Sequence, residues 1–362
     1  MVVLFLILSS VLSLQGALGS GRELKRVCYF TNWSNKVQVV EARFHIKDIN
    51  PALCTHLIFA FARINTDSFR LNPTEVDDDN GSLTNKAGRY FDFTDLKKKN
   101  PKLVTLLSVG GASLSDAFIA VVSSPTLIRL FATNCVVYLR DRKFDGLDID
   151  WEFPGRTLKD QFTELIRALR EGFEREAFEQ GRPRLLLTIA AGVGEEALQS
   201  YNITQVVGYV DFVNLMAYDF HGAWNGITAF SGPLYSRLSN YQFSPFLSQN
   251  WAVQHWLNES GFPEKLVLGV SLTGLSFTLE DPERNGVGAP IIDKGYAGPL
   301  KMIPGHLAYP EICQMLQNGA TRVWDGEQKV NYAYKDNQWV GFEDRDSIKI
   351  KTQYALDMGL GE

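Results

Sequence analysis

The chain has 362 residues, of which 45% are hydrophobic and 21% are charged, and its formal net charge is −5. This length suits one large α/β barrel or two small domains. The mild acidity argues against a nucleic-acid partner, which would require a basic face.

The N-terminus predicts a secretory signal over residues 1–20. Residues 2–14 form an apolar run, and Ala17, Leu18 and Gly19 supply small residues for cleavage. A membrane anchor is the alternative, but the run is too short to span a bilayer comfortably. No later segment has a transmembrane pattern, so we expect a secreted, soluble protein that does not bind membranes.

Strand-like runs alternate with helical patterns along the rest of the chain. The strands are expected at 26–33, 54–62, 102–109, 144–152, 184–192, 210–218 and 264–272, with helices such as 126–142 and 158–180 between them. This alternation predicts an α/β fold with a parallel sheet, namely a (β/α)8 TIM barrel. Chemistry in such barrels takes place where the strands end. Gly110, Glu152, Tyr218 and Asp219 lie at such ends.

Only seven barrel strands can be counted. Residues 353–362 predict the last helix and its turn towards a final strand, so the eighth strand is apparently missing. Two edges of the sheet would then stay unpaired. The sequence is therefore either a fragment or truncated product, or something else closes the gap.

Three carboxylates follow one another at a spacing of two on the strand at 144–152: Asp148, Asp150 and Glu152. In a strand this spacing points all three to one face, and Leu147, Ile149 and Trp151 to the other. Like charges on one strand cost stability, and one of them can remain protonated. Glu152 ends the run and is the candidate general acid. A charged edge strand is the alternative, but the apolar alternation favours a buried strand.

The region 275–341 breaks the alternation and is rich in Gly, Pro and Tyr. Its aromatic bulk favours a packed small domain over a loop: Tyr296, Tyr309, Tyr332, Tyr334 and Trp339. We therefore divide the chain into the signal at 1–20, the first part of the barrel at 21–274, an α+β insertion at 275–341 and a last barrel helix at 342–362. The acidic run at 77–81 lacks a full calcium-loop pattern and is expected to be solvated. The His residues show no metal spacing, so we predict neither a metal nor a cofactor.

The segment 146–152 resembles the active-site strand of family 18 glycoside hydrolases, the chitinases, and the animal secreted chitinases in particular. Further motifs resemble that family in order along the chain: Val27 to Trp33, Cys54 to Ala62, Ser108 to Gly111, and Asn214 to Gly222. The resemblance covers nearly all of the chain after the signal.

The resemblance implies a retaining hydrolysis in which the substrate's own acetamido group attacks the anomeric carbon. Glu152 would protonate the glycosidic oxygen, Asp150 would orient the acetamido N–H, and Asp148 would share a proton with Asp150. Tyr218 would hydrogen-bond the acetamido oxygen. Chitin or a chitooligosaccharide would be the substrate and binding partner of a monomeric protein. Further substrate-binding residues are implied: Tyr29, Phe61, Gly110, Gly111, Phe153, Met216, Asp219 and Trp224.

Several positions depart from the family pattern. Ala112 stands where the family has a Trp, Thr273 and Leu275 stand in place of a Tyr and an Arg, and Phe153 replaces a Tyr. The Trp that the family carries on its eighth strand has no counterpart. These losses thin the binding groove while the acids remain, so a chitinase-like lectin without turnover, or an inactive truncated product, is the alternative function.

The four cysteines fit an oxidising compartment. By resemblance, Cys28 and Cys54 form a disulfide between the first two strands, and Cys313 lacks its family partner. Cys135 lies in an amphipathic helical stretch and is expected to be a buried free thiol. Glycosylation sequons begin at Asn32, Asn80, Asn202 and Asn258. Asn32 is the poorest acceptor of these, because its strand should hold it near the barrel mouth.

Overall fold

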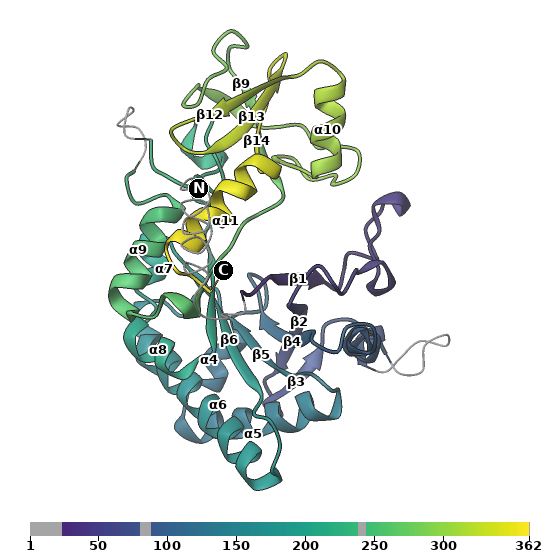
Figure 1. Ribbon diagram of the computed structural model, residues 1–362, viewed down its shortest axis with the longest axis vertical. Coiled ribbons are helices and arrows are strands. Elements are labelled where there is room, and N and C mark those ends of the chain that lie inside the picture. The colour runs from purple at the N-terminus through teal and green to yellow at the C-terminus, as the bar shows by residue number, and fades with distance from the viewer. Residues whose placement is uncertain (1–23, 80–87, 238–243, 362) are drawn as a thin grey trace, which may run out of the picture.

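The computed structural model describes residues 24–79, 88–237 and 244–361. The predicted signal and the sequon at Asn80 lie outside these residues. Figure 1 shows a curled sheet with helices in the lower part of the view and a smaller sheet above it.

The main sheet confirms the predicted TIM-barrel class. Seven parallel strands follow one another in the order β1-β2-β4-β5-β6-β7-β8, and β3 pairs with β2 in antiparallel orientation. Their bounds are β1 Val27–Thr31, β2 His56–Asn65, β3 Arg70–Pro73, β4 Val104–Gly110, β5 Gly146–Asp150, β6 Leu186–Gly192, β7 Phe212–Met216 and β8 Leu266–Leu268. These strands are rich in β-branched and aromatic residues that are buried on both faces, as parallel sheets require.

The described residues contain no eighth parallel strand. Gly361 lies between the two outermost strands of the sheet: its N–H donates to Leu266 O at 2.8 Å, and its carbonyl accepts from Lys25 N at 3.0 Å. The chain therefore touches both β8 and the start of β1 at this one residue.

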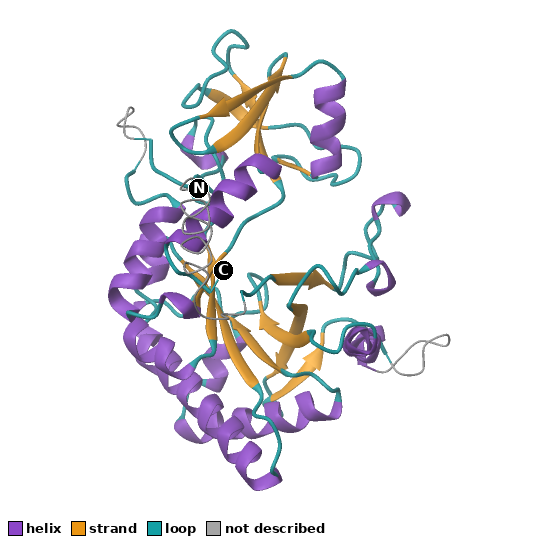
Figure 2. Ribbon diagram, viewed as in Figure 1, coloured by secondary structure: helices purple, strands orange, loops and turns teal. Residues whose placement is uncertain are grey.

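Helices cover the outer face of the main sheet (Figure 2). They are α4 Ala117–Val121, α5 Pro125–Asp141, α6 Lys159–Gln180, α7 Glu195–Leu198, α8 Ile203–Tyr209 and α9 Gln249–Ser260, with α2 Val76–Asp79 and α3 Arg89–Thr94 beside β2 and β3. The start of α5 illustrates the local signals: Ser124 accepts from Leu127 N, and Pro125 occupies the first turn. Short 3-10 helices complete the connections: Val40–Ala42, Ile46–Asp48, Asp95–Lys98, Arg156–Leu158, Ala223–Asn225 and Pro263–Lys265.

The second sheet is antiparallel and follows β8 in the chain. Its order is β10-β9-β14-β13-β12, with β11 on β9. The bounds are β9 Gly274–Leu279, β10 Ile291–Lys294, β11 His306–Leu307, β12 Thr321–Asp325, β13 Val330–Lys335 and β14 Gln338–Phe342, with α10 Tyr309–Gln317 between β11 and β12. Trp339 and Tyr332 are buried in its core as expected, whereas Tyr296 and Tyr309 are exposed, because they lie outside the packed face.

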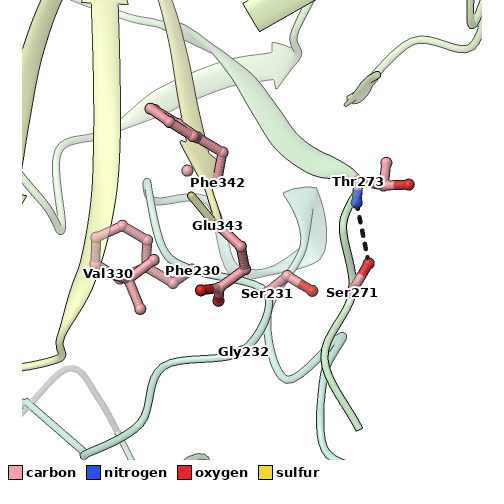
Figure 3. Close-up of a pocket in the computed structure, with 9 residues that line it drawn as sticks. Phe230, Ser231, Gly232, Ser271, Thr273, Val330, Phe342 and Glu343 are labelled. Carbon is pink, nitrogen blue, oxygen red and sulfur yellow. Dashed lines mark hydrogen bonds between the residues drawn. The ribbon is translucent and has the colours of Figure 1, made fainter. Parts of the chain in front are cut away.

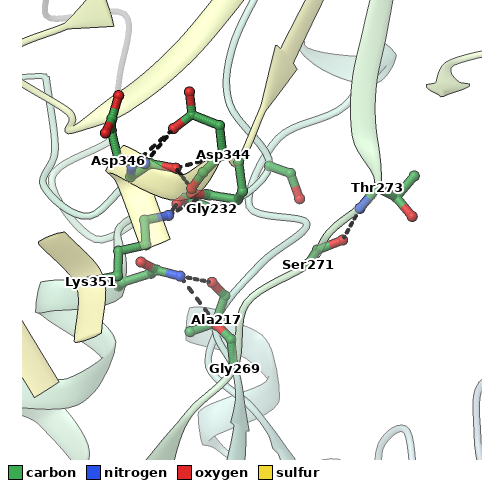
Figure 4. Close-up of polar contacts among 12 residues, drawn as sticks. Ala217, Gly232, Gly269, Ser271, Thr273, Asp344, Asp346 and Lys351 are labelled. Carbon is green, nitrogen blue, oxygen red and sulfur yellow. Dashed lines mark hydrogen bonds and ion pairs between the residues drawn. The ribbon is translucent and has the colours of Figure 1, made fainter. Parts of the chain in front are cut away.

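A buried ion pair joins the second sheet to the barrel (Figure 4). Lys351 of α11, Arg345–Asp357, pairs with Glu343 just after β14 and donates to Gly232 O in the loop after β7. Lys351 and Glu343 are 1% and 8% exposed. Nearby, Gln249 Nε2 donates to Ala217 O and Gly269 O. These contacts connect the ends of β7 and β8 to the second sheet.

The predicted disulfide between Cys28 and Cys54 is present, and it ties β1 to the segment before β2. Cys135 is a buried free thiol, as predicted, and Cys313 is also free among the described residues. Asn32 is buried and its amide donates to Thr74 and Asp78. The structure does not test glycosylation.

The acidic run before α3 corrects one expectation. Asp78 is buried and pairs with Arg89, and Asp79 pairs with Arg142, so these carboxylates are not solvated. The sequence predicted solvation because their basic partners follow 11 and 63 residues later. Burial raises the pKa of Asp78 to about 6. Within the described parts of the chain, no group of three or more potential ligands could hold a metal ion, and no helix is long and apolar enough to cross a membrane.

Candidate active site

Strand β5 carries the first two acids of the acidic run at the centre of the parallel sheet. The apolar partners of the alternation, Leu147, Ile149 and Trp151, all belong to the main core. Trp151 stacks on Phe118 with ring centroids 5.0 Å apart. The alternation thus commits one face of the strand to the helices and leaves the acids on the other.

Asp148 is fully buried and accepts four hydrogen bonds. Its Oδ2 accepts from Tyr29 OH at 3.0 Å and Ser108 Oγ at 2.8 Å. Its Oδ1 accepts from Thr188 Oγ1 at 2.6 Å and Asn214 Nδ2 at 3.3 Å. Burial raises the pKa of Asp148, and these donors lower it again. Four donors favour the charged form of this carboxylate.

Asp150 has the opposite environment. It is 4% exposed, and its Oδ1 has no hydrogen-bond partner among the described residues. Burial, followed by the charges of Asp148 and Glu152, raises the pKa of Asp150 to about 9. Within the pair, the proton therefore resides on Asp150 at neutral pH and the charge resides on Asp148.

Glu152 follows β5 and is half-buried. Its backbone N–H donates to Ser115 Oγ at 2.8 Å, which fixes the chain where the strand ends. Burial raises the pKa of Glu152, and the charge of Asp219 raises it further, while a backbone contact at Ala112 lowers it. A carboxyl group with a raised pKa keeps its proton closer to neutral pH, as a general acid must.

Tyr218 and Asp219 come from the segment that follows β7. Burial and then the charge of Asp150 raise the pKa of Tyr218 well above its usual value. Asp219 has a φ of 56° and exchanges two contacts with one hydroxyl: its N–H donates to Ser231 Oγ, and Ser231 Oγ donates to its Oδ1, both at 3.0 Å. The interactions of Glu152 with Asp219 and of Tyr218 with Asp150 place these groups around one site.

A cavity of about 640 Å³ opens at this point. Five of the predicted site residues line it: Glu152, Phe153, Met216, Tyr218 and Asp219. The remaining wall comes from the segment after β6 and from Gly155, Phe220 and Leu247. This volume lies within the range of small-molecule sites.

The other predicted binding residues do not line this cavity. Tyr29 donates to Asp148, and Phe61 lies between Trp33, 6.0 Å away, and Gly111, whose added Cβ would come within 2.7 Å of the Phe61 ring. A Cβ on Gly110 would be 2.0 Å from Asp150 O. The two glycines thus allow β4 to approach β5 closely. Trp224 is 75% exposed in the short helix Ala223–Asn225.

A second, much smaller pocket lies beside the junction of the two sheets (Figure 3). Its lining includes Ser231, Ser271, Thr273 and Glu343, and its volume is about 10 Å³. This is room for a single water molecule. The larger cavity beside Glu152 is therefore the candidate site for a substrate.

Several supporting residues had not been predicted. They are the donors to Asp148 on neighbouring strands, the two serines that hold Glu152 and Asp219, and the cavity wall after β6: Ser108, Thr188, Asn214, Ser115, Ser231 and residues 192–197. Ser108 and Asn214 lie in segments at the ends of predicted strands, which is the one signal that could have identified them. Ser115 and Ser231 carry no such signal.

Comparisons with known proteins agree with this geometry. The family model described as glycosyl hydrolases family 18 matches residues 25–361. The chain is 39% identical over 348 residues to Chitotriosidase-1 of Mus musculus, covering 94% of this chain and 72% of that protein. It superposes on the active chitinase of Trichuris suis with a TM-score of 0.87 and 30% identity, covering 94% and 90% of the two chains.

A third relative differs in activity. Human YKL-39, described as a pseudo-chitinase with retained chitooligosaccharide binding properties, superposes with a TM-score of 0.86 and 37% identity, covering 94% of this chain and 91% of that one. Proteins similar to this chain therefore include both active and inactive ones. With a family model that spans nearly the whole chain and the parallel-strand barrel in place, the chain belongs to glycosyl hydrolases family 18.

Proposed function

We propose that this chain is a chitinase that hydrolyses β-1,4-linked N-acetylglucosamine polymers or oligomers with retention. The observation that carries the proposal is the placement of Glu152, with its raised pKa, on the wall of a substrate-sized cavity directly after the buried pair Asp148 and Asp150. A pair of carboxyl groups whose environments separate their pKa values is typical of acid–base sites.

In the first step, the proton of Glu152 passes to the glycosidic oxygen and the bond from that oxygen to the anomeric carbon breaks. The acetamido oxygen of the same sugar forms the new bond to that carbon, which gives an oxazolinium ion. Asp150 orients the acetamido N–H, and Tyr218 hydrogen-bonds the acetamido oxygen. Asp148 and Asp150 share one proton, so the pair carries one negative charge opposite the cation.

In the second step, water attacks the anomeric carbon and the ionised Glu152 takes up its proton. The bond to the acetamido oxygen breaks, and the sugar is released with its original configuration. The requirement for an acetamido group explains why N-acetylglucosamine polymers are the proposed substrate class.

The experiment compares hydrolysis of a fluorogenic chitotrioside by the wild type and by Glu152→Gln. Glu179→Gln, at an exposed position of α6 outside the cavity, is the matched control. We expect Glu152→Gln to lower kcat by at least about a hundredfold, because general acid catalysis contributes on that scale, and the control to match the wild type. A folded wild type without turnover would refute the proposal.

The second candidate is a lectin that binds chitooligosaccharide without turnover. It is favoured by the pseudo-chitinase among the similar structures and by the departures in the groove. Ala112 has no ring to stack on a sugar, and Leu275 is buried in the second sheet. Binding of chitotetraose by a wild type that does not hydrolyse it would support the lectin.

We also propose that the protein is secreted as a monomer. The Cys28–Cys54 disulfide supports an oxidising compartment, and the predicted signal supports export. Detection of the chain in the medium of expressing cells, with a monomer mass by light scattering, would test both points.

A further inference from the structure

The cavity beside Glu152 extends well past the carboxyl group itself. Beyond Glu152 and Tyr218 its wall is formed by residues 192–197, which lead from the end of β6 into α7. A cavity of about 640 Å³ therefore adjoins the proposed reaction centre, and its wall includes side chains that the mechanism does not use.

The ionisable side chains on this wall are all acidic. They are Glu152, Glu195, Glu196 and Asp219, and the described residues that line the cavity include no Lys, Arg or His. Glu195 and Glu196 are exposed and form no ion pair with any other part of the chain that the structure describes. Their charge is thus not neutralised within the cavity, and it favours a cation there.

An aromatic ring provides the apolar part of the same cavity. Phe153 is 43% exposed, and its ring lies over Gly192, where an added Cβ would come within 2.5 Å of it. Aromatic faces are suited to stacking against the C–H face of a sugar ring. The cavity therefore combines a surface for a sugar with unpaired negative charge.

A buried polar atom distinguishes this place from an ordinary acidic surface. Asp150 is 4% exposed, and its Oδ1 lacks a partner in the described parts of the chain. Asp150 ends β5, two residues before Glu152. Buried polar atoms are nearly always hydrogen-bonded in native proteins, so this one indicates a polar ligand group at the reaction centre.

We propose that the cavity binds a sugar unit with a free, protonated 2-amino group, so that the preferred substrate is partially deacetylated chitin. The unit that reacts must keep its acetamido group, because that group supplies the nucleophile. The cationic glucosamine unit occupies the neighbouring position, near Glu195 and Glu196. This inference rests on the proposed function and narrows its substrate class. Fully deacetylated polymer is accordingly not cleaved.

The acidic pair also has a purely structural explanation. Glu195 and Glu196 occupy the first turn of α7, where acidic side chains are stabilised by the helix dipole. Replacing both with Gln removes the charge and keeps the size, so a structural role would alter stability and leave the choice of substrate unchanged.

The test compares the wild type, the double variant Glu195→Gln/Glu196→Gln and the control Glu179→Gln. Each digests partially deacetylated chitin, and mass spectrometry identifies the sugar units on both sides of every cleaved bond. We expect glucosamine to be enriched next to the reacting N-acetylglucosamine unit with the wild type and the control, and the double variant to lose that enrichment. For this substrate, kcat/KM should fall roughly three- to tenfold in the double variant, as expected for two exposed charge pairs, and stay unchanged for fully acetylated oligomers.

Added salt should weaken the wild-type preference, because exposed charges are screened. Identical product ends from the wild type and the double variant would overturn the inference. A wild type that hydrolyses nothing would refute the proposed function, and calorimetry then decides the inference separately. A matched loss of affinity for glucosamine-containing oligomers alone would support it, and equal affinities would contradict it.

Discussion

At the scale of single residues, the three acids of the acidic run differ through their surroundings. Asp148 accepts four hydrogen bonds, Asp150 has an oxygen without a partner, and Glu152 is half-buried beside Asp219. Identical chemistry in three environments thus gives one charged group, one protonated group and one proton donor.

The charge of Asp219 should set the upper pH limit of activity. Glu152 acts in its protonated form, so kcat/KM falls as the pH rises through its pKa. Asp219→Asn removes a charge that raises this pKa, so the basic limb of the pH profile should move to lower pH. Asp219→Glu keeps the charge and should keep the limb in place. A basic limb that stays where it is in Asp219→Asn would contradict this assignment.

The raised pKa of Asp150 predicts a dependence of stability on pH. The folded state holds a proton on Asp150 up to about pH 9, whereas the unfolded chain releases it near the ordinary value for Asp. The folded state therefore binds more protons between these values, and the free energy of unfolding falls as the pH rises.

Urea unfolding of Asp150→Asn, which cannot ionise, should reveal this contribution. From about pH 5 to about pH 8, the variant should lose less stability than the wild type, by about 1 kcal/mol or more. Parallel curves for the two proteins would show that Asp150 does not hold the proton.

At the scale of elements, the site depends on how closely β4 approaches β5. Gly110 has a φ of 113°, and Gly111 N donates to Asp150 O at 2.8 Å. Ser115, which follows in the same connection, holds the N–H of Glu152. The segment after β4 therefore fixes the position where the acidic run leaves its strand.

Gly110→Ala should damage this contact. Its Cβ would lie 2.0 Å from Asp150 O, and Ala tolerates a positive φ poorly. We expect a loss of about 2–4 kcal/mol in the free energy of unfolding, measured by denaturant titration. Gly208→Ala in α8, where a Cβ meets no atom within 4 Å, is the control and should be neutral or gain up to about 1 kcal/mol. Equal stabilities of the two variants would refute this reading of the strand contact.

At the scale of the whole molecule, a buried charge pair holds the second sheet against the barrel. Lys351 contacts Glu343 and the carbonyl of Gly232, and the neighbouring Ser231 holds Asp219. The junction is thus connected to the candidate site through consecutive residues. Burial lowers the pKa of Lys351, and Glu343 opposes that shift.

Removing one member of this pair should cost more than removing both. Lys351→Met leaves the Glu343 carboxylate buried without its partner, and we expect a loss of about 3–5 kcal/mol in the free energy of unfolding. The double variant Lys351→Met/Glu343→Leu should recover a large part of it, since no buried charge remains. Thermal or denaturant unfolding of the three proteins checks this order. A double variant less stable than the single one would argue against an uncompensated charge as the cause.

The sequence was sufficient for features that depend on neighbouring residues. The alternation of acids with Leu147, Ile149 and Trp151 predicted which side chains enter the core, and the repeated strands and helices predicted the parallel barrel. Such patterns are local, because the facing of a side chain on a strand follows from its position alone.

Only the tertiary structure decided which distant groups meet. Tyr29 and Asn214, 119 and 66 residues from Asp148, supply two of its donors. Ser115 and Ser231 support Glu152 and Asp219, and Glu195 and Glu196 enter the cavity wall. Asp78, expected to be solvated, is buried against Arg89. These contacts depend on how the sheet curls and how its connecting segments pack, and the period of the sequence does not encode either.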